Sequence, residues 1–485
     1  MGLVTPVDAV PVRELGRVHF VGIGGAGMSG IARIMLADGL VVSGSDAASS
    51  PQLTSLVALG AQVTVGHSAE SLGDLGAGDT LVVSSAIRPD NPELREARRR
   101  GLRVLHRAAA LASLMLGRQG IAVAGTHGKT TTTSMITTVL RHGGADPSYV
   151  IGGILSGTGL GADRGDGPAF VAEADESDGS FLTLSPDAAV VTCVEADHLD
   201  NYADLAQIEA AFRTFAGKIT SGGLLVACAD DPGARDLVRR TAADRGDDLR
   251  IVTYGSAPDA DYRLSDVRPR GMATRLTVTG TPGSRAHPAG PVTIEIAVPG
   301  RHNALNAAGA FALTAELGLA PDQVAAGLAA YGGARRRMEL KGEADGVQVV
   351  DSYAHHPTEL AADLAAARDV TTSGRVIVLF QPHLFSRTRI FAAEFGAALG
   401  QADEVLVLDI YAAREDPEPG VTGRLVSDAV PGGRAVFLPD RASAPDVVAG
   451  LAKPGDLVLT MGAGDVTALG PQIVDALRAR AGEQA

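Results

Sequence analysis

Cysteine, aromatic residues and long apolar runs are scarce in this chain, and each scarcity excludes a class of protein. The 485 residues include two cysteines and no tryptophan, and aromatic residues make up 4%. Cys193 and Cys228 both lie inside apolar stretches, which predicts reduced core thiols rather than a disulfide framework or a metal site. No run of 18 apolar residues occurs, and the N-terminus lacks a basic segment followed by an apolar one. We therefore expect a cytoplasmic protein without membrane insertion.

Basic residues are also outnumbered, with 42 Lys and Arg against 56 Asp and Glu and a net charge of −14. Because a nucleic-acid backbone needs a basic face to neutralise it, we expect no nucleic-acid partner. A composition of 45% hydrophobic and 20% charged residues is ordinary for a folded chain. The length exceeds what one hydrophobic core usually supports, which predicts about three domains.

The hydrophobic pattern indicates an α/β protein. Short β-branched runs alternate with helical patterns over residues 17–116, which predicts a parallel sheet with crossover helices. The pattern restarts near Gly117 with the strand IAVAG, a glycine-containing turn and a helix over about 129–142. Alternating stretches over residues 260–298 predict an antiparallel extension of this second sheet. A third segment, from about residue 333, again predicts a parallel sheet.

The turn before the 129–142 helix has the character of a phosphate-binding loop. Gly125 and Gly128 let backbone N–H groups approach phosphate oxygens, and the helix N-terminus adds a positive dipole. Lys129 can reach the β- and γ-phosphates, and Thr130 offers a hydroxyl to Mg²⁺. The match to the common pattern is incomplete, because Val123 occupies the first glycine position. We predict nucleotide contacts from Gly125, Thr126, His127, Gly128, Lys129, Thr130 and Thr131.

A second glycine-rich loop lies earlier in the chain, where Gly22 to Gly27 fit the G-x-G-x-x-G pattern and Asp46 ends the next strand. Alone, this loop favours a dinucleotide, but the same geometry holds any pyrophosphate, including that of a UDP-sugar. Tight strand–helix packing for the glycines and turn capping for Asp46 remain open. A dehydrogenase would not explain the second phosphate loop. A nucleotide switch without catalysis is another alternative, which would keep Lys129 but would need no binding site for an acceptor substrate.

Seven blocks along the chain resemble the Mur ligase family: GIGGAGMSGIA, AGTHGKTTT, EADESDGSFL, EADHLDNY, GRHNALNA, DSYAHHPTE and QPHLFSRTR. They follow the family order across essentially the whole sequence. The resemblance implies an N-terminal Rossmann-like domain for a UDP-sugar over 1–116, a central P-loop ATPase domain over 117–332 and a C-terminal Rossmann-like domain over 333–485.

The alanine-adding branch of the family is the most similar. The resemblance implies ATP-dependent ligation of L-alanine to the lactyl carboxylate of UDP-N-acetylmuramate, through an acyl phosphate, in peptidoglycan precursor synthesis. The alternative is the recycling ligase that attaches a preformed tripeptide to the same sugar. ATP and Mg²⁺ are the expected cofactors, and we expect a monomer or weak dimer.

The resemblance also implies roles for individual residues. Lys129, Glu173 and His198 are the expected catalytic residues, with Thr130 and Glu173 as ligands of one Mg²⁺ and His198 of a second. Two anions must meet in such a reaction, so cationic groups are needed to offset their repulsion. Glu176 and Asp178 remain substitutes for Glu173.

Further contacts are expected from three other places. Asn303 and, less surely, His302 and Asn306 open a helix near the adenine or ribose, although helix capping is an alternative. Arg389 is expected on ATP, with a solvated basic turn as the alternative. Asp351 begins a polar cluster at a strand end, where packing is the competing interpretation. The expected substrate-binding residues are Gly24, Gly25, Ala26, Gly27, Met28, Ser29, Asp46, Tyr353, His355, His356 and Arg387.

Overall fold

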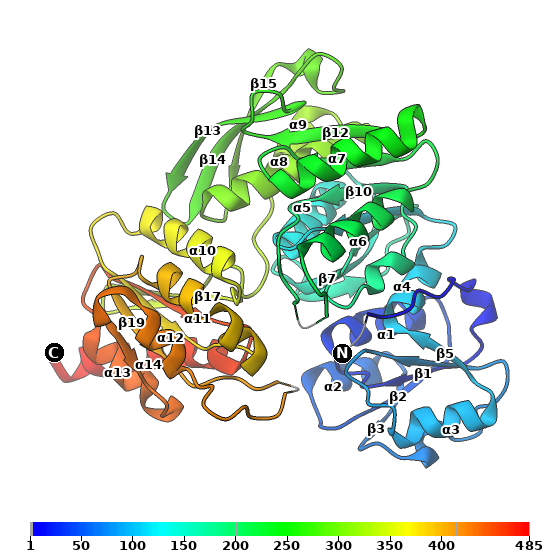
Figure 1. The fold of residues 1–485 in the computed structure, drawn as a ribbon, viewed down its shortest axis with the longest axis horizontal. Helices are drawn as coiled ribbons and strands as arrows, with labels where there is room; N and C mark the ends of the chain where they lie inside the picture. Colours follow the sequence, from blue (N-terminus) through cyan, green and yellow to red (C-terminus); the bar gives the residue numbers. More distant parts are fainter. Residues whose placement is uncertain (1–2, 200, 414, 485) are drawn as a thin grey trace. The chain divides into compact units, whose positions relative to one another are not determined.

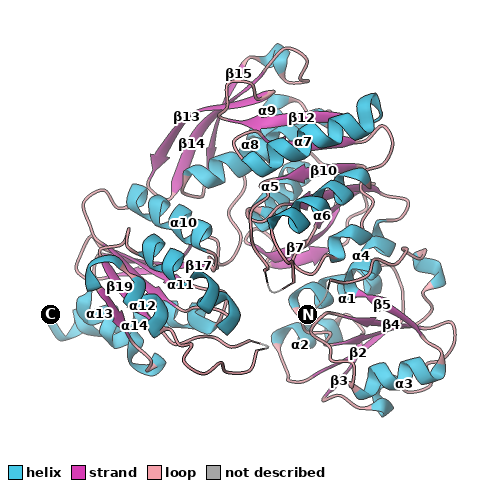
Figure 2. Cartoon of the chain, viewed as in Figure 1, coloured by secondary structure: helices cyan, strands magenta, loops and turns pink. Residues whose placement is uncertain are grey.

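The computed structural model describes residues 3–199, 201–413 and 415–484. The chain forms two compact units, which are described separately below. The first unit comprises Met1–Ser265, Thr277–Ile294 and Asn306–Tyr331, and the second comprises Asp266–Leu276, Glu295–Leu305 and Gly332–Ala485. Strands with flanking helices recur along the chain (Figures 1 and 2), which confirms the predicted α/β class.

The N-terminal sheet is parallel, as predicted, with strand order β3-β2-β1-β4-β5. Its central strand β1 is buried throughout because helices cover both faces. The strands are β1 (Val18–Val21), β2 (Val42–Asp46), β3 (Gln62–Val65), β4 (Thr80–Val83) and β5 (Arg103–His106), and the helices are α1 (Ala26–Ala37), α2 (Pro51–Ala58), α3 (Pro92–Arg100) and α4 (Arg107–Met115).

The second sheet has the order β15-β14-β13-β12-β11-β10-β6-β9-β7-β8. The helix predicted after IAVAG is α5 (Lys129–His142). The strands are β6 (Gln119–Ala124), β7 (Ser148–Leu155), β8 (Leu160–Asp163), β9 (Ala169–Glu173), β10 (Ala188–Val191), β11 (Leu224–Cys228), β12 (Arg250–Gly255), β13 (Tyr262–Arg270), β14 (Ala273–Gly280) and β15 (Pro291–Ile296). The other helices are α6 (Leu205–Gly217), α7 (Pro232–Arg245), α8 (Arg301–Glu316) and α9 (Pro321–Ala329).

The predicted antiparallel extension is present at one end of this sheet. β13 and β14 are hydrogen-bonded neighbours joined by two residues, a connection that only antiparallel strands can make. β15 alternates exposed and buried residues, as expected for a strand with one solvated face. At the opposite end, β8 pairs antiparallel with β7, a pairing that the hydrophobic pattern did not predict.

The third sheet, in the second unit, has the order β16-β17-β21-β18-β19-β20. The prediction of a wholly parallel sheet is wrong at one edge, where β16 pairs antiparallel with β17. Asp345 and Gly346, both with positive φ, join these strands in the tight turn that an Asp-Gly pair favours. The strands are β16 (Glu339–Ala344), β17 (Val347–Ser352), β18 (Val376–Phe380), β19 (Glu404–Val407), β20 (Ala435–Phe437) and β21 (Leu457–Met461).

Helices α10 (Pro357–Val370), α11 (Phe385–Leu399), α12 (Arg424–Ala429), α13 (Ala444–Leu451) and α14 (Leu469–Gln484) accompany the third sheet. Short 3-10 turns occur at Val12–Glu14, Ala69–Leu72, Ser180–Thr183, Gly246–Asp248, His287–Ala289, Pro431–Gly433, Arg441–Ser443 and Asp465–Ala468. Within the described ranges, every helix is too short or too polar to cross a membrane.

An aromatic cluster holds the segment after β9 against α6. The ring of Phe181 stacks on that of Phe215 with centroids 5.1 Å apart, and meets Phe212 edge-on at 5.3 Å. All three side chains are fully buried. Burial of such large rings makes this cluster a main anchor of the acidic segment that precedes Phe181.

Replacing Phe181 with alanine should lower the free energy of unfolding by about 3–5 kcal/mol, because it leaves a large cavity in the core. Leu205→Ala, at the exposed start of α6, should change it by no more than about 0.5 kcal/mol. Urea titration followed by far-UV circular dichroism would measure both. Equal losses in the two variants would contradict the anchoring role.

Candidate active site

The loop between β6 and α5 has the backbone conformation of a phosphate-binding turn. Gly125 and Gly128 have φ of +134° and +81°, which side chains other than glycine rarely adopt. A Cβ atom on Gly125 would lie 2.0 Å from Thr192 Oγ1, and one on Gly128 would lie 2.5 Å from Asn306 Oδ1. Both positions therefore require glycine, and α5 begins at Lys129 with its N-terminus at the loop.

The ammonium group of Lys129 folds back over this loop. Nζ donates to the carbonyl oxygens of Gly125 at 2.7 Å and Thr126 at 3.2 Å, and to Glu176 Oε1 at 2.8 Å. Burial alone would lower the lysine pKa, but the charges of Glu176 and Asp175 raise it above its ordinary value. Lys129 is thus held as a cation at the place where phosphate would bind.

Thr130 and Glu173 lie together beside the same loop, as expected from the sequence. Thr130 Oγ1 donates to Glu173 Oε1 at 3.1 Å, and the backbone N–H of Gly152 donates to Glu173 Oε2 at 2.7 Å. A hydroxyl and a carboxylate side by side are oxygen donors of the type that Mg²⁺ prefers. The donor set of this pair therefore fits a magnesium ion.

His198, with a φ of +53°, lies beside Glu176, the carboxylate that Lys129 also contacts. Its Nε2 is 3.4 Å from Glu176 Oε1 and 3.5 Å from Asp197 Oδ2. Burial would lower its pKa, but the hydrogen bond to Glu176 and the charge of Asp197 raise it overall. The carboxylate of Glu176 therefore contacts both Lys129 and His198.

Asp178, the second proposed substitute for Glu173, faces the N-terminal sheet. Its carboxylate accepts from Ser85 Oγ and from the backbone N–H of Ser180, and it lies 3.7 Å from His106 Nε2. These contacts join the acidic segment to β5 and the loop after β4. They give Asp178 a different role from that of Glu173.

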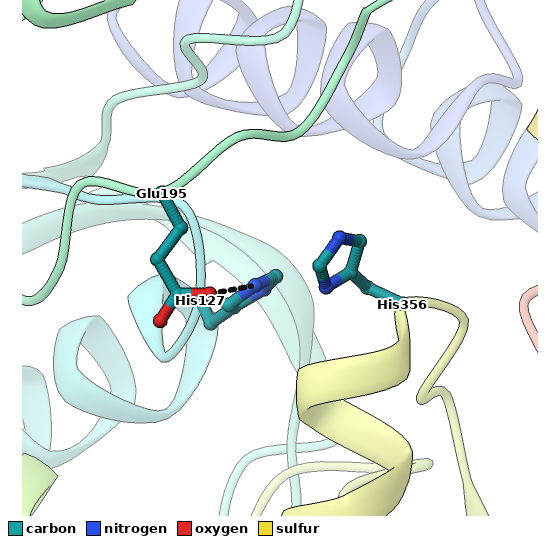
Figure 3. A group of neighbouring side chains, drawn as sticks. All are labelled: His127, Glu195 and His356. Atoms are coloured by element: carbon teal, nitrogen blue, oxygen red, sulfur yellow. Dashed lines mark ion pairs between the residues drawn. The ribbon is translucent and has the colours of Figure 1, made fainter. Parts of the chain in front are cut away.

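Two residues that the sequence did not assign to the site, Cys193 and Glu195, support the phosphate loop. Cys193 Sγ accepts the N–H of His127 at 3.2 Å, and the N–H of Glu195 donates to Thr126 Oγ1 at 2.8 Å. His127 Nε2 also lies 3.7 Å from Glu195 Oε2, as the dashed line in Figure 3 marks. Cys228 is a core thiol as predicted, whereas Cys193 is free but partly exposed beside the loop. In the sequence, residues 192–197 (TCVEAD) could be recognised only as the end of a strand, which gave no indication that Cys193 and Glu195 would contact the loop.

The earlier glycine loop closes on Asp46. The N–H of Gly24 donates to Asp46 Oδ2 at 2.8 Å, and Gly25 is the N-cap of α1. The carboxylate thus braces the loop, which is the turn-capping role left open by the sequence. Met28 is 3% exposed, so its side chain packs in the core and only its backbone lies at the helix start. Ser29 Oγ donates to the carbonyl of Ala26 at 3.2 Å.

Arg107, which sequence reasoning missed, connects this loop to the acidic segment after β9. Its Nη2 is 2.6 Å from Asp175 Oδ2, and a Cβ on Gly27 would lie 3.3 Å from its Nη1. Burial would raise the pKa of Asp175, but the charges of Arg107 and Lys129 lower it well below its usual range. An isolated arginine in the sequence offers no signal for such a role.

In the second unit, Tyr353 and His355 pack together at the end of β17. Their rings meet edge-on with centroids 5.1 Å apart, and the guanidinium of Arg336 lies over the Tyr353 ring at 4.8 Å. His355 Nδ1 is 3.0 Å from the carbonyl oxygen of Tyr353 and 3.2 Å from Glu359 Oε2. Asp351 is fully buried and accepts hydrogen bonds from Thr460 and Thr467, and its Oδ2 lies 3.5 Å from Arg336 Nε.

The remaining predicted residues of the second unit differ in their surroundings. His356 is the N-cap of α10 and accepts from the N–H of Thr358, and its ring lies 5.1 Å from that of Phe391. Arg387 is 7% exposed, whereas Arg389 is half-exposed with its Nε 3.1 Å from Glu418.

The residues that open α8 take part in local contacts. Asn303 Nδ2 donates to the carbonyl of Pro299 at 2.7 Å, a contact that joins the start of α8 to the preceding turn. His302 Nε2 is 3.4 Å from Asp363 Oδ1, and burial holds the pKa of His302 below its ordinary value. Asn306, in the first unit, is the residue whose amide lies against Gly128.

Known proteins match this chain over nearly all its length. Models of the Mur ligase family catalytic domain, the Mur ligase middle domain and the Mur ligase glutamate ligase domain match residues 17–119, 123–314 and 336–464. The chain belongs to the Mur ligase family. A UDP-N-acetylmuramate–L-alanine ligase of Thermobifida fusca is 58% identical over 98% of this chain and 100% of its own length. One of Kineococcus radiotolerans is 58% identical over 97% and 98%.

Solved structures of the family share the fold. The UDP-N-acetylmuramate–alanine ligase of Thermotoga maritima aligns with a TM-score of 0.77 at 28% identity, covering 97% of this chain and 100% of that chain. A murein peptide ligase of Psychrobacter arcticus aligns with a TM-score of 0.69 at 24% identity, covering 96% and 99%. The second likeness shows the Mur ligase fold alone.

The pairing of Asp175 with Arg107 predicts a pH-dependent contribution to stability. Because the pKa of Asp175 is lowered in the folded state, its contribution is present above the unfolded value of about 3.9 and is lost as pH falls through the folded value. Asp175→Asn should therefore reduce the free energy of unfolding at pH 7, and the difference from wild type should shrink in strong acid. Urea titrations across pH would measure this.

Asp90→Asn, at an exposed position before α3, is the matched control and should leave the stability unchanged at every pH. A wild-type minus Asp175→Asn difference that stays constant as the pH falls would contradict the assignment.

Proposed function

We propose that this chain joins L-alanine to the lactyl carboxylate of UDP-N-acetylmuramate at the expense of ATP, in peptidoglycan precursor synthesis. The carboxylate takes the γ-phosphoryl group to form an acyl phosphate, and the amine of alanine then displaces phosphate. The observation that carries the proposal is the Lys129 cation, held on a phosphate loop by two backbone carbonyls and the carboxylate of Glu176. The 58% identical alanine ligases support the choice of substrates.

The first unit supplies the groups that this chemistry needs. Lys129 neutralises charge on the transferred phosphoryl group, because a cation preorganised at that point favours the transition state over the ground state. The backbone N–H groups from Gly125 to Thr131 bind the nucleotide phosphates. The loop of Gly24, Gly25, Ala26 and Gly27, with the backbone at Met28 and Ser29, binds the pyrophosphate of the UDP-sugar. Asp46 holds the conformation of that loop by accepting a hydrogen bond from the N–H of Gly24.

Magnesium is the metal that fits the described donor sets best. Thr130 and Glu173 would hold one ion, and their oxygen atoms already lie within hydrogen-bonding distance. His198 would serve a second ion, supported by its place next to Glu176. Such ions offset the repulsion between a carboxylate and a polyphosphate.

The second unit supplies the remaining contacts in this proposal. Tyr353, His355, His356 and Arg387 bind the incoming alanine, with the guanidinium suited to its carboxylate. Asn303 and Arg389 contact ATP. We assign residues 1–116 to UDP-sugar binding, 117–332 to ATP binding and 333–485 to amino-acid and ATP contacts. The enzyme acts in the cytoplasm as a monomer or weak dimer.

The tripeptide-adding reaction is not favoured. The curated relatives at 53–58% identity are alanine ligases, whereas the murein peptide ligase shares only the fold. Phosphate release should therefore require UDP-N-acetylmuramate and L-alanine together. A coupled phosphate assay with each component omitted would test this, and turnover with a tripeptide but not with alanine would reverse the assignment.

Lys129→Ala should nearly abolish ligation, with a loss in kcat of about 100-fold or more, since the transferred phosphoryl group loses a positioned cation. Lys453→Ala, an exposed lysine of the second unit, is the control and should leave the rate unchanged. Steady-state rates with thermal melts of both variants would measure this. A folded Lys129→Ala enzyme with wild-type turnover would rule out the role.

A further inference from the structure

The hydrogen-bond donors of the Lys129 ammonium are all taken up by the protein itself. A lysine ammonium carries three N–H donors and no acceptor. Its three acceptors in this structure are the carbonyl of Gly125 at 2.7 Å, the carbonyl of Thr126 at 3.2 Å and Glu176 Oε1 at 2.8 Å. A phosphate can therefore bond to Lys129 only by displacing one of these acceptors.

The two carbonyl acceptors belong to a backbone that is held in place. A Cβ on Gly125 would lie 2.0 Å from Thr192 Oγ1, so this part of the loop packs closely against the end of β10. The N–H of Thr126 donates to the carbonyl of Cys193 at 3.0 Å. A shift of either carbonyl would disturb these contacts, whereas a side chain can turn about its single bonds. The acceptor that a ligand displaces is therefore the carboxylate of Glu176.

Glu176 is held firmly by its backbone and on one side only by its carboxylate. Its carbonyl accepts from the hydroxyl of Tyr202 at 2.6 Å and from the N–H of Gly179 at 2.9 Å. The side chain is 2% exposed, yet Oε2 is buried and has no hydrogen-bond partner among the residues that the structure describes. A buried carboxylate oxygen without a donor is costly. The carboxylate therefore loses little on leaving this position beyond its contacts through Oε1.

The same oxygen also covers His198. Glu176 Oε1 lies 3.4 Å from His198 Nε2, in addition to its contact with Lys129. Carboxylate and phosphate oxygens are both anionic acceptors of charge-assisted hydrogen bonds. Glu176 Oε1 thus has the chemistry of a phosphate oxygen, and it occupies the place on Lys129 that a phosphate oxygen would take.

We propose that Glu176 is a specificity-determining residue of the phosphate site, whose carboxylate competes with the phosphate groups of ligands for Lys129. The inference rests on the proposed function for the identity of the nucleotide. A polyphosphate reaches more of the loop N–H groups than inorganic phosphate does, so it displaces the carboxylate more readily. Glu176 thereby favours the nucleotide over the inorganic phosphate that the reaction releases.

Glu176→Gln tests the competition, because it keeps the size of the side chain and removes its charge. Its Kd for ATP in EDTA should fall about tenfold, the contribution of one hydrogen bond to a charged group, and inorganic phosphate should compete with ATP more strongly by a similar factor. AMP should bind as it does to wild type, because Lys129 reaches the β- and γ-phosphates. Calorimetry would measure these affinities. Glu394→Gln, at an exposed position of α11, is the control and should change none of them.

The sign of the change separates competition from a structural role. Damage to the loop would weaken ATP binding, whereas loss of a competitor strengthens it. Unchanged or weaker ATP binding by a Glu176→Gln protein that thermal melts show to be folded would overturn the proposal. An equal gain for AMP would also overturn it, since that would reveal a general effect of charge. Selective weakening of the Mg²⁺ complex of ATP would contradict it by showing that Glu176 holds the metal.

A crystal structure of wild type with a nonhydrolysable ATP analogue tests the displacement without any substitution. Lys129 should bond to the nucleotide and no longer to Glu176, and a retained contact between Lys129 and Glu176 would refute the proposal. Neither experiment requires ligation. Wild type that binds ATP but ligates nothing would defeat the proposed function alone. A ligating enzyme whose Glu176→Gln variant shows no gain in ATP affinity would defeat only this inference.

Discussion

The buried ammonium of Lys129 is the constraint on which the rest of the site depends. Two loop carbonyls and the Glu176 carboxylate surround it, and the Lys129 side chain is only 13% exposed. Low local polarity makes each of these contacts strong, and removing one partner would leave a buried charge or carboxylate uncompensated. Gly125 of the loop and Glu176 of the acidic segment after β9 contact this group directly, and His198 contacts Glu176.

Parallel sheets explain why such groups meet. The carboxyl ends of neighbouring strands lie at one edge, so Glu173 at the end of β9, Thr192 after β10 and the loop after β6 converge although they are far apart in sequence. The same rule brings the ends of β2 and β3 together in the N-terminal sheet, where Asp46 pairs with Val65. Arg107 and Asp178 then join the two edges within the first unit through ion pairs and hydrogen bonds.

The predicted site residues differ in the kind of sequence pattern from which they were predicted. Lys129 and Thr130 were predicted from a motif whose glycines specify a backbone conformation, whereas Glu173 was predicted only from the family resemblance and lies beside Thr130. Met28 was chosen by its place in a motif, yet its side chain is buried in the core, and Asp351 at the end of β17 is buried among Arg336, Thr460 and Thr467. The antiparallel edge strand β16 was missed although Asp345-Gly346 is a strong hairpin signal, because the parallel rhythm of the segment was given more weight.

The sequence alone determined the α/β class, the helix from Lys129 to His142, the phosphate loop and the family, because periodicity, turn glycines and motif order are local properties of a chain. Only the tertiary structure decided that Asp46 accepts a hydrogen bond from Gly24 and that Glu176 contacts both Lys129 and His198. It also decided that the Glu93 carboxylate lies within hydrogen-bonding distance of His19, Ser45 and His67. Those pairings join residues up to 74 positions apart. Their partners are selected by strand order and burial, which no local pattern of residues encodes.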